Sequence, residues 1–273
     1  MQWIIDLWMF LKCLFVKPKT NKYGWKRPLP HAGHKTYKIE NRTAGLPTKV
    51  DLRTKMPPVY DQSSLGSCTA NGTLASVQYE QIHHGLPNYM LSRLFQYYNT
   101  RAIEKTTGSD SGGTIADAVK AVATYGFCPE NMWQYVISRF TQRPPAACYL
   151  AAKKNILRSV DYYNVAQNAY DMKHALANGN CIIIGFTVYE SFESPQVAKT
   201  GIVPMPDIYN EQVMGGHCVL VVGYDDTKKK WIVRNSWGSM WGMAGYCLFP
   251  EEYLTNPNLA DDFWVIKTVP GAK

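Results

Sequence analysis

The sequence lacks several features that would place it in a special class of protein. It has no run of about 20 apolar residues, the length that an α-helix needs to span a membrane. Only 18% of its residues are charged and 46% are hydrophobic, which excludes a disordered tail protein and a coiled coil. Its 7 cysteines never occur with CxxC spacing, so it contains neither a zinc ribbon nor a thioredoxin motif. The length of 273 residues therefore indicates a globular protein of two domains or one large one.

The basic residues, which give a net charge of +8, do not gather on one element. The densest run, Lys228 to Lys230, follows two aspartates and is typical of an exposed turn. No nucleic-acid-binding motif accompanies these residues, and the histidines lack cysteine or carboxylate partners at the spacing of metal ligands. We therefore expect no nucleic-acid partner, no metal ion and no cofactor.

The first 46 residues differ in composition from the rest of the chain. Residues 3–16 are apolar except for Asp6 and Lys12, but they lack a preceding positive flank and a small-residue cleavage site. They are thus a poor secretory signal, which favours an intracellular protein over a secreted one. We expect a packed or amphipathic extension, with weak association with a membrane surface as the alternative. Residues 17–47 are rich in proline and lysine without a period, which is typical of an extended linker or a pro-segment.

The order of the predicted elements indicates an α+β protein. Hydrophobic periodicity predicts helices over residues 68–82, 92–98 and 114–125, the last with the capping pair Thr114 and Asp117 and the stop signal Gly126. From residue 180 the pattern predicts strands, over residues 181–186, 217–224 and 231–235. Helices followed by strands predict two segregated lobes. We expect an extension over residues 1–46, a helical lobe over 47–155 and a β-rich lobe over 156–273.

Cys68 begins the first predicted helix, where the positive end of the helix dipole favours a thiolate and lowers the pKa of the thiol. An imidazole partner completes the activation, because a thiolate and imidazolium pair is a strong nucleophile. His217 is the best candidate because it opens a predicted strand that returns after a turn. If Thr227 is the centre of that turn, Asn235 opposes Val219 and lies diagonally beside His217 on the same face. The carboxamide of Asn235 would then orient the imidazole.

These residues belong to a pattern that resembles the papain-like cysteine proteases from about residue 46 to residue 267. The resemblance rests on Gln62, Gly66-Ser67-Cys68, Gly216-His217, Asn235-Ser236-Trp237-Gly238, Ser111-Gly112-Gly113, and a start at Leu46-Pro47 like that of the mature domain. It implies a papain-like fold of two lobes. The helical lobe carries the nucleophile, an antiparallel β-sheet or barrel lobe carries the histidine and the asparagine, and the active site lies in the cleft between them.

The resemblance also implies a role for each matching residue. Cys68 is the nucleophile, His217 the general base and then the acid, and Asn235 the residue that orients the ring. The side-chain amide of Gln62 and the backbone N–H of Cys68 form the oxyanion hole. Trp237 shields the histidine, and the peptide substrate is bound by Gly112, Gly113, Thr114, Gly216 and Trp237. Gly113 in particular offers its backbone N–H and C=O to an extended substrate, which would pair with it like an added strand.

Two residues depart from the family pattern. Leu65 stands where the family has a cysteine that forms its usual cross-link, and Thr69 stands where an aromatic residue follows the nucleophile. Neither change removes a catalytic atom. The other cysteines do not fall at the family's usual disulfide positions, which weakens the case for an oxidising compartment.

The expected function is that of a monomeric cysteine endopeptidase that cleaves peptides or proteins through a thioester acyl-enzyme. It would be made as a zymogen if residues 1–46 are a short pro-segment that covers the cleft. Two alternatives stay open: a non-catalytic papain-fold protein that binds peptides, and an acyl transferase or amidase that uses the same triad.

Overall fold

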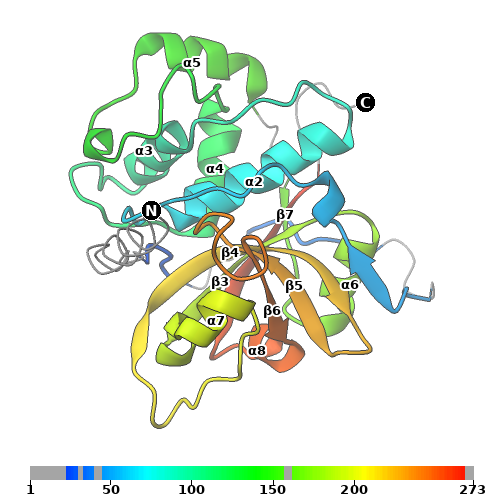
Figure 1. Cartoon of the computed structure of the whole chain (residues 1–273). Helices are drawn as coiled ribbons and strands as arrows, with labels where there is room; N and C mark the ends of the chain where they lie inside the picture. The colour runs from blue at the N-terminus through cyan, green and yellow to red at the C-terminus, as the bar shows by residue number, and fades with distance from the viewer. Residues whose placement is uncertain (1–22, 30–32, 40–44, 157–161, 268–273) are drawn as a thin grey trace, which may run out of the picture.

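The computed structural model describes residues 23–29, 33–39, 45–156 and 162–267. In this part of the chain a helical half lies against a sheet-containing half (Figure 1). The helical half, at the top of that view, consists of α2 (Cys68–His83), α3 (Arg93–Ile103), α4 (Ile115–Tyr125) and α5 (Ala146–Ala152). The predicted apolar extension over residues 3–16, with its expected membrane-surface association, lies outside the described residues.

The sheet half is built on an antiparallel sheet of seven strands in the order β2-β7-β3-β4-β5-β6, with β1 paired to β4. The strands are β1 (Lys49–Asp51), β2 (Tyr162–Asn164), β3 (Ile182–Tyr189), β4 (Val213–Asp225), β5 (Lys230–Arg234), β6 (Tyr246–Pro250) and β7 (Ala260–Ile266). Short helices accompany it, namely α6 (Ala169–Ala177), α7 (Pro195–Thr200) and α8 (Glu251–Thr255). The described strands form an open sheet. The resemblance implied a sheet or a barrel, and the structure has the sheet.

The three predicted helices are present, and their caps explain where they begin. The Ser92 side chain accepts a hydrogen bond from Phe95 N–H at the start of α3, and the Thr114 side chain accepts one from Asp117 N–H at the start of α4. Helix α4 ends at the predicted Gly126, whose φ is +72°. Helix α3 runs five residues further than predicted, because its second half is also buried.

The strand predicted to open at His217 in fact begins at Val213, because Gly215 and Gly216 pair with Val188 and Thr187 of β3. His217 therefore lies inside a long central strand and not at its end. This position buries the imidazole completely.

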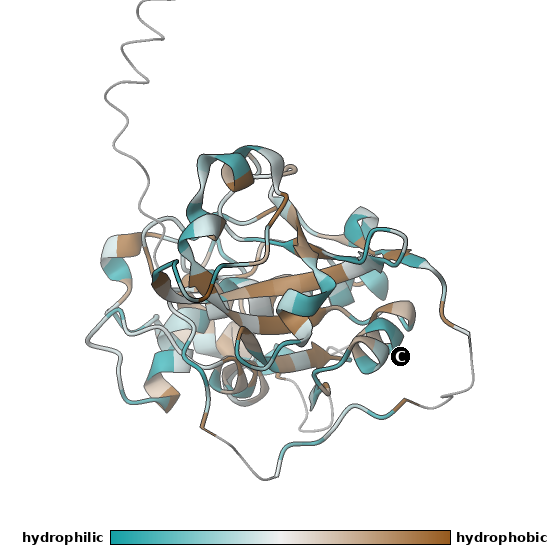
Figure 2. Cartoon of the chain, turned by 90° about the horizontal axis from the view of Figure 1, so that it is seen from below, coloured by the Kyte–Doolittle hydropathy of each residue, from teal (hydrophilic) through white to brown (hydrophobic). Residues whose placement is uncertain are grey.

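Side chains on both faces of the sheet are buried, which explains the nearly continuous apolar sequence of β3 and β4. On one face Ile183 packs with α2 and α4, and on the other Ile182 and Ile184 pack with α6 and α8 residues. Figure 2 shows these strands as a brown layer inside the molecule, with the paler and teal helices outside. A Cβ on Gly72 of α2 would lie 3.0 Å from the Cys218 sulfur, so the helix approaches β4 closely.

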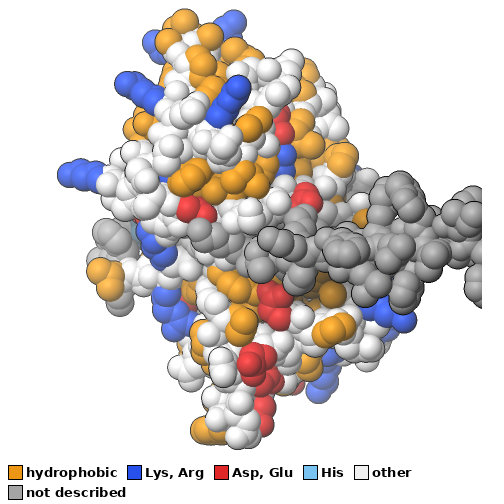
Figure 3. Space-filling view, turned by 60° about the vertical axis from the view of Figure 1, so that its left-hand side comes forward, with side chains coloured by type: hydrophobic (Ala, Val, Ile, Leu, Met, Phe, Trp, Pro, Cys, Tyr) orange, Lys and Arg blue, Asp and Glu red, His pale blue; other side chains and the backbone are white. Residues whose placement is uncertain are grey.

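The surface in Figure 3 does not gather its basic side chains into one patch. Lysines and arginines lie mainly around the edges of that face, whereas acidic side chains form a row on the sheet-containing half. Among the described residues, no helix is both long and apolar enough to span a bilayer.

Candidate active site

Cys68 is the first residue of α2, and its sulfur lies where this helix meets β4. The backbone N–H groups of Cys218, Gly24 and Thr69 lie near enough to the thiol to lower its pKa, although burial has the larger effect. The thiol thus lies beside the peptide group that joins His217 to Cys218. The helical half and the sheet half meet at this point, as the resemblance implied.

The pairing of β4 with β5 brings Asn235 to His217. Leu220 lies opposite Arg234, as the predicted turn centre requires. Nearer the turn the register is shifted by one residue because β4 has a bulge between Val221 and Gly223, so the prediction is wrong there. The bulge lies on the turn side and leaves the register at the site end as predicted. His217 Nε2 lies 2.8 Å from Asn235 Oδ1.

The hydrogen bonds around Asn235 fix the tautomer of the neutral histidine. The Asn235 oxygen accepts a hydrogen bond from Ser236 N–H at 2.8 Å, and a backbone N–H is always a donor. The atom that faces His217 is therefore an oxygen, so Nε2 of the ring donates to it. Nδ1 then carries a lone pair, and this buried atom has no hydrogen-bond partner. A base with a free lone pair is the arrangement needed to accept a thiol proton.

Gln62 is fixed between the two halves of the molecule. Its Oε1 accepts a hydrogen bond from Ser236 Oγ at 2.6 Å, and its backbone N–H donates to the Ser236 carbonyl at 2.8 Å. Its Nε2 donates to the Leu65 carbonyl at 3.0 Å. These contacts orient the side-chain NH₂ toward the loop that precedes the nucleophile. Ser236, whose role the sequence did not reveal, thus links the amide of Gln62 to the carboxamide of Asn235.

Trp237 packs on the predicted base. Its ring lies 5.0 Å from the His217 ring, centroid to centroid, with an interplanar angle of 31°. Trp237 is 6% exposed and Asn235 is 2% exposed, so water does not compete for the hydrogen bond between His217 and Asn235. The shielding role of Trp237 stays a prediction, and this packing is what it requires.

Residues 23–27 lie between Gly113 of the helical half and Gly216 of the sheet half. We call these residues the blocking segment and the space that they occupy the groove. The Gly24 carbonyl accepts a hydrogen bond from Gly113 N–H at 2.7 Å, and Lys26 N–H donates to the Gly113 carbonyl at 3.1 Å. On the opposite wall, Trp25 N–H donates to the Gly216 carbonyl at 2.9 Å. Gly113 and Gly216, two of the predicted substrate-binding residues, therefore hold an extended backbone on either side.

The backbone of the blocking segment fits closely because Gly24 lies in space between Gly66 and Gly112. A Cβ on Gly24 would lie 1.9 Å from the carbonyl oxygen of Gly66, and a Cβ on Gly112 would lie 1.9 Å from the carbonyl oxygen of Gly24. Both distances are far below a van der Waals contact. Gly112, with φ of +68°, thus lets the backbone of another segment approach, as expected for its position.

The side chain of Trp25 fills a pocket between the two halves. A Cβ on Gly185 would overlap its ring, at 1.9 Å from Cε2, so the pocket depends on a glycine within β3. Trp25 Nε1 donates to the buried Asp262 carboxylate at 3.2 Å. The same carboxylate accepts hydrogen bonds from Trp264 Nε1 at 2.5 Å and from Ile115 N–H at 3.0 Å. Burial raises the pKa of Asp262 to about 6, although these donors oppose the shift.

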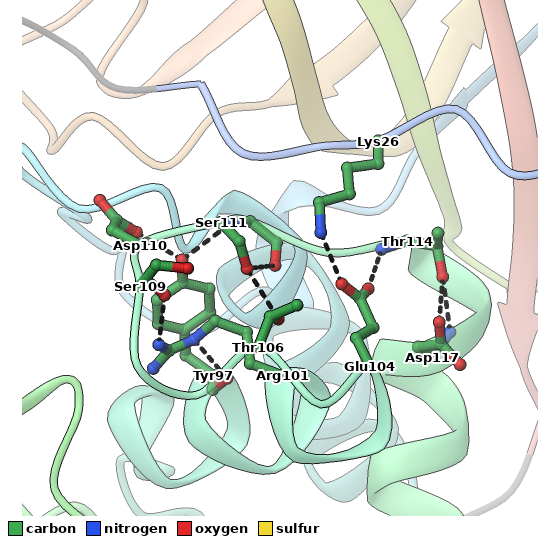
Figure 4. A network of polar contacts seen from close by, with 11 residues as sticks. Lys26, Tyr97, Arg101, Glu104, Thr106, Ser109, Asp110, Ser111, Thr114 and Asp117 are labelled. Carbon is green, nitrogen blue, oxygen red and sulfur yellow. Dashed lines mark hydrogen bonds and ion pairs between the residues drawn. The ribbon is translucent and has the colours of Figure 1, made fainter.

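Charged residues hold the end of the blocking segment outside the groove. Lys26 Nζ lies 2.6 Å from Glu104, whose carboxylate also accepts a hydrogen bond from Thr114 N–H (Figure 4). Arg27 lies 3.7 Å from Asp261 and is more exposed. The side chain of Thr114 bonds Asp117 and caps α4, so in this state it does not bind the segment in the groove.

The blocking segment also covers the predicted catalytic residues. Tyr23 packs against His217 with ring centroids 6.0 Å apart, and Cys68 and His217 are both 0% exposed. Burial raises the pKa of the Cys68 thiol to about 11 and lowers the pKa of His217 to about 4. At neutral pH both groups are therefore uncharged in this state. The predicted depression of the thiol pKa is not observed here, because burial outweighs the helix dipole.

Sequence reasoning predicted Gly216 but missed two other residues of the sheet half that contact the blocking segment, Gly185 and Asp262. Gly185 interrupts the apolar run from Ile182 to Phe186, and this interruption was the available signal. Asp262 lies among apolar residues of β7 and gave a weaker signal. In the described part of the chain, no three His, Cys, Asp or Glu side chains lie close enough to hold a metal ion. The six cysteines described, all buried, form no disulfide.

Comparison with known proteins identifies the family. Residues 46–262 match the sequence profile of the papain family cysteine proteases. The chain belongs to this family, and it is accordingly a cysteine peptidase, a hydrolase whose substrates are peptides or proteins. The papain-like α+β fold implied by the resemblance is confirmed.

Individual relatives come from distant sources. The chain is 40% identical over 254 residues to an uncharacterized peptidase C1-like protein of Acanthamoeba polyphaga mimivirus, which covers 86% of this chain and 81% of that protein. It is similar to the crystal structure of xylellain, a cysteine protease from Xylella fastidiosa, with 39% identity and a TM-score of 0.84, over 92% of this chain and 98% of that one. A procathepsin B from Trypanosoma congolense shares the fold, with 20% identity and a TM-score of 0.73 over 90% of this chain and 86% of that one.

Proposed function

We propose that this peptidase is an endopeptidase that cleaves through Cys68, His217 and Asn235, and that it is held inactive by its own blocking segment. The observation that carries the proposal is the free Nδ1 lone pair of His217, on a ring whose Nε2 is held by Asn235. The Cys68 thiol transfers its proton to Nδ1, and its sulfur attacks the substrate carbonyl. The imidazolium then gives this proton to the leaving amine, and water hydrolyses the thioester.

The oxyanion of the tetrahedral intermediate is stabilised by the Gln62 side-chain amide and by the Cys68 backbone N–H. Support comes from the rigid mounting of Gln62, whose Oε1 accepts from Ser236 and whose NH₂ is thereby directed to the nucleophile loop. A preorganised donor costs no reorganisation when charge develops on the substrate oxygen. Gly113 and Gly216 bind the substrate backbone with the groups that now hold the blocking segment.

The blocking segment explains why the described state is inactive. Gly24 lies between Gly66 and Gly113, beside the Cys68 thiol, so the segment occupies the place where a substrate backbone would bind. Its removal lets water reach both groups, which relieves the desolvation that holds the thiol and the imidazole uncharged. The full chain is in this sense a zymogen, and release of residues 23–27 activates it.

The experiment uses the full chain with the single substitution Gly24→Ala. The added methyl would lie 1.9 Å from the backbone oxygen of Gly66, so the segment must leave the groove while the enzyme body is unchanged. We expect covalent labelling by a thiol-directed epoxide peptide, read by intact mass, and cleavage of an extended peptide within its sequence. Cys68→Ala in the same chain should abolish both.

Gly45→Ala is the matched control, because a Cβ on Gly45 meets no atom within 4 Å. This variant should stay as unreactive as the wild type. Absence of peptide cleavage by the Gly24→Ala chain would contradict the catalytic proposal, whether or not Cys68 is labelled. Equal activity of the wild-type, Gly45→Ala and Gly24→Ala chains would refute the blocking role alone.

A further inference from the structure

The two backbone walls of the groove come from segments far apart in the sequence. One wall is the nucleophile loop, residues 61–67, whose Gly66 carbonyl faces Gly24. The other is the glycine loop, residues 104–113, whose Gly112 and Gly113 face the same backbone from the other side. Because the fit on both sides leaves no room for a methyl group, the separation of these walls decides how well a peptide backbone binds.

Asp110 joins the two walls. Both of its carboxylate oxygens accept from Gly66 N–H, at 3.1 and 3.2 Å. The hydroxyl of Tyr97 donates to the same carboxylate and accepts a hydrogen bond from Gly112 N–H at 3.0 Å. A continuous path of three hydrogen bonds thus runs from Gly66 of the nucleophile loop through Asp110 and Tyr97 to Gly112.

A buried guanidinium, that of Arg101, supports this path of hydrogen bonds. Arg101 is 0% exposed, and its guanidinium lies 4.0 Å from the centre of the Tyr97 ring. It donates to the carbonyls of Thr107 at 3.0 Å and Ser109 at 2.7 Å, which fixes the loop that carries Asp110. Figure 4 shows Asp110, Tyr97 and Arg101 together at the left of the view, apart from the ion pair of Lys26 with Glu104.

The protonation states suit this arrangement. Burial, and then the hydrogen bond to Asp110, raise the pKa of Tyr97, so its hydroxyl keeps the proton that it donates. A charge-assisted hydrogen bond between a hydroxyl and a carboxylate is about twice as strong as a neutral one. The carboxylate can therefore hold two separate segments at once.

We propose that Asp110 is a positioning residue, which sets the distance between Gly66 and Gly112 and so tunes the groove for an extended peptide backbone. The inference rests on the proposed function of the groove as the substrate site. Asp110 touches neither the substrate nor the reacting atoms, and acts through the two glycine N–H groups.

The test compares Asp110→Ala, Asp110→Asn and Tyr97→Phe in the full Gly24→Ala chain. Cleavage of an extended peptide should lose about tenfold in kcat/KM in Asp110→Ala, mainly through KM, because backbone binding is misplaced while the triad is intact. Asp110→Asn, which keeps one acceptor for Gly66, should lose less. Alkylation of Cys68 by iodoacetamide, a reagent too small to use the groove, should stay within about twofold of the parent.

Asp117→Ala is the control, because it removes a carboxylate that lies near the glycine loop and caps α4 through Thr114. It should lower the melting temperature without raising KM. The double variant Asp110→Ala/Tyr97→Phe should be no worse than Asp110→Ala, because both residues act in one path.

The outcomes separate the two proposals. A Gly24→Ala parent that cleaves no peptide refutes the proposed function and the positioning role with it. A parent that cleaves, with KM unchanged in Asp110→Ala and in Tyr97→Phe, overturns the positioning role alone. Equal loss in peptide cleavage and in iodoacetamide alkylation would show a general structural defect and would also overturn it.

Discussion

The indole of Trp25 donates a hydrogen bond to the carboxylate of Asp262 across the boundary between the N-terminal extension and the last strand of the sheet. Asp262 is 4% exposed, and Trp25 is 7% exposed. A buried carboxylate requires donors, and this one receives a donor from a segment that must leave when the groove opens. The blocking segment is thus held by a polar contact in an apolar pocket as well as by its backbone.

The first prediction concerns this contact. Trp25→Phe keeps an aromatic ring in the pocket but removes the donor. A hydrogen bond to a charged group contributes about 1.5–3 kcal/mol, so the population of the open form should rise by at least about tenfold. Alkylation of Cys68 in the full chain, measured by intact mass against time, should accelerate accordingly.

Trp133→Phe is a matched control for this prediction, because Trp133 is buried and its Nε1 has no hydrogen-bond partner. It should leave the alkylation rate of Cys68 unchanged. Equal rates for Trp25→Phe and the wild type would show that Asp262 does not hold the segment.

The second prediction concerns the pH dependence of thiol reactivity. Burial under the blocking segment raises the pKa of Cys68 to about 11 and lowers the pKa of His217 to about 4, so the closed state favours the uncharged thiol. Alkylation of the wild-type chain should therefore rise continuously with pH through the neutral range. In Gly24→Ala the thiol is hydrated and paired with an imidazolium, so the midpoint should move to lower pH. Superimposable profiles for the two chains would contradict the coupling between the segment and the thiol.

The third prediction concerns Glu80, a carboxylate of α2 outside the groove. It is 2% exposed, and burial raises its pKa to about 8 from an ordinary 4.5. Because the folded state binds this proton more tightly than the unfolded state, the free energy of unfolding falls as pH rises from about 4.5 to about 8. Glu80→Gln removes the buried charge. It should stabilise the protein by about 1–3 kcal/mol at pH 9 and have little effect at pH 4.

Thermal unfolding of the two proteins at both pH values measures this effect. His84 Nε2 lies 3.4 Å from the Glu80 carboxylate. Glu252→Gln, at an exposed position, is the control and should change the melting temperature little at either pH. A destabilised Glu80→Gln protein at pH 9 would be the opposite of the expected result.

The local sequence predicted the elements that carry the candidate site. The capping residues Ser92 and Thr114 and the stop signal Gly126 placed α3 and α4, because a cap depends only on groups within one turn of the helix. The turn after β4 was short enough for its register to be inferred, which placed Asn235 beside His217. The bulge in β4 was not predictable, since it depends on how the strand packs and not on its turn.

What the sequence by itself determined was the family, the order of helices before strands, and the identity of the proposed nucleophile, base and orienting residue. These properties follow from residue types and local spacing, which can be read directly from the sequence. The tertiary structure alone decided that residues 23–27 lie in the groove and that burial keeps Cys68 and His217 uncharged. It also decided that Asp110 links Gly66 to Gly112. Burial and these contacts join segments far apart along the chain, so no local pattern contains them.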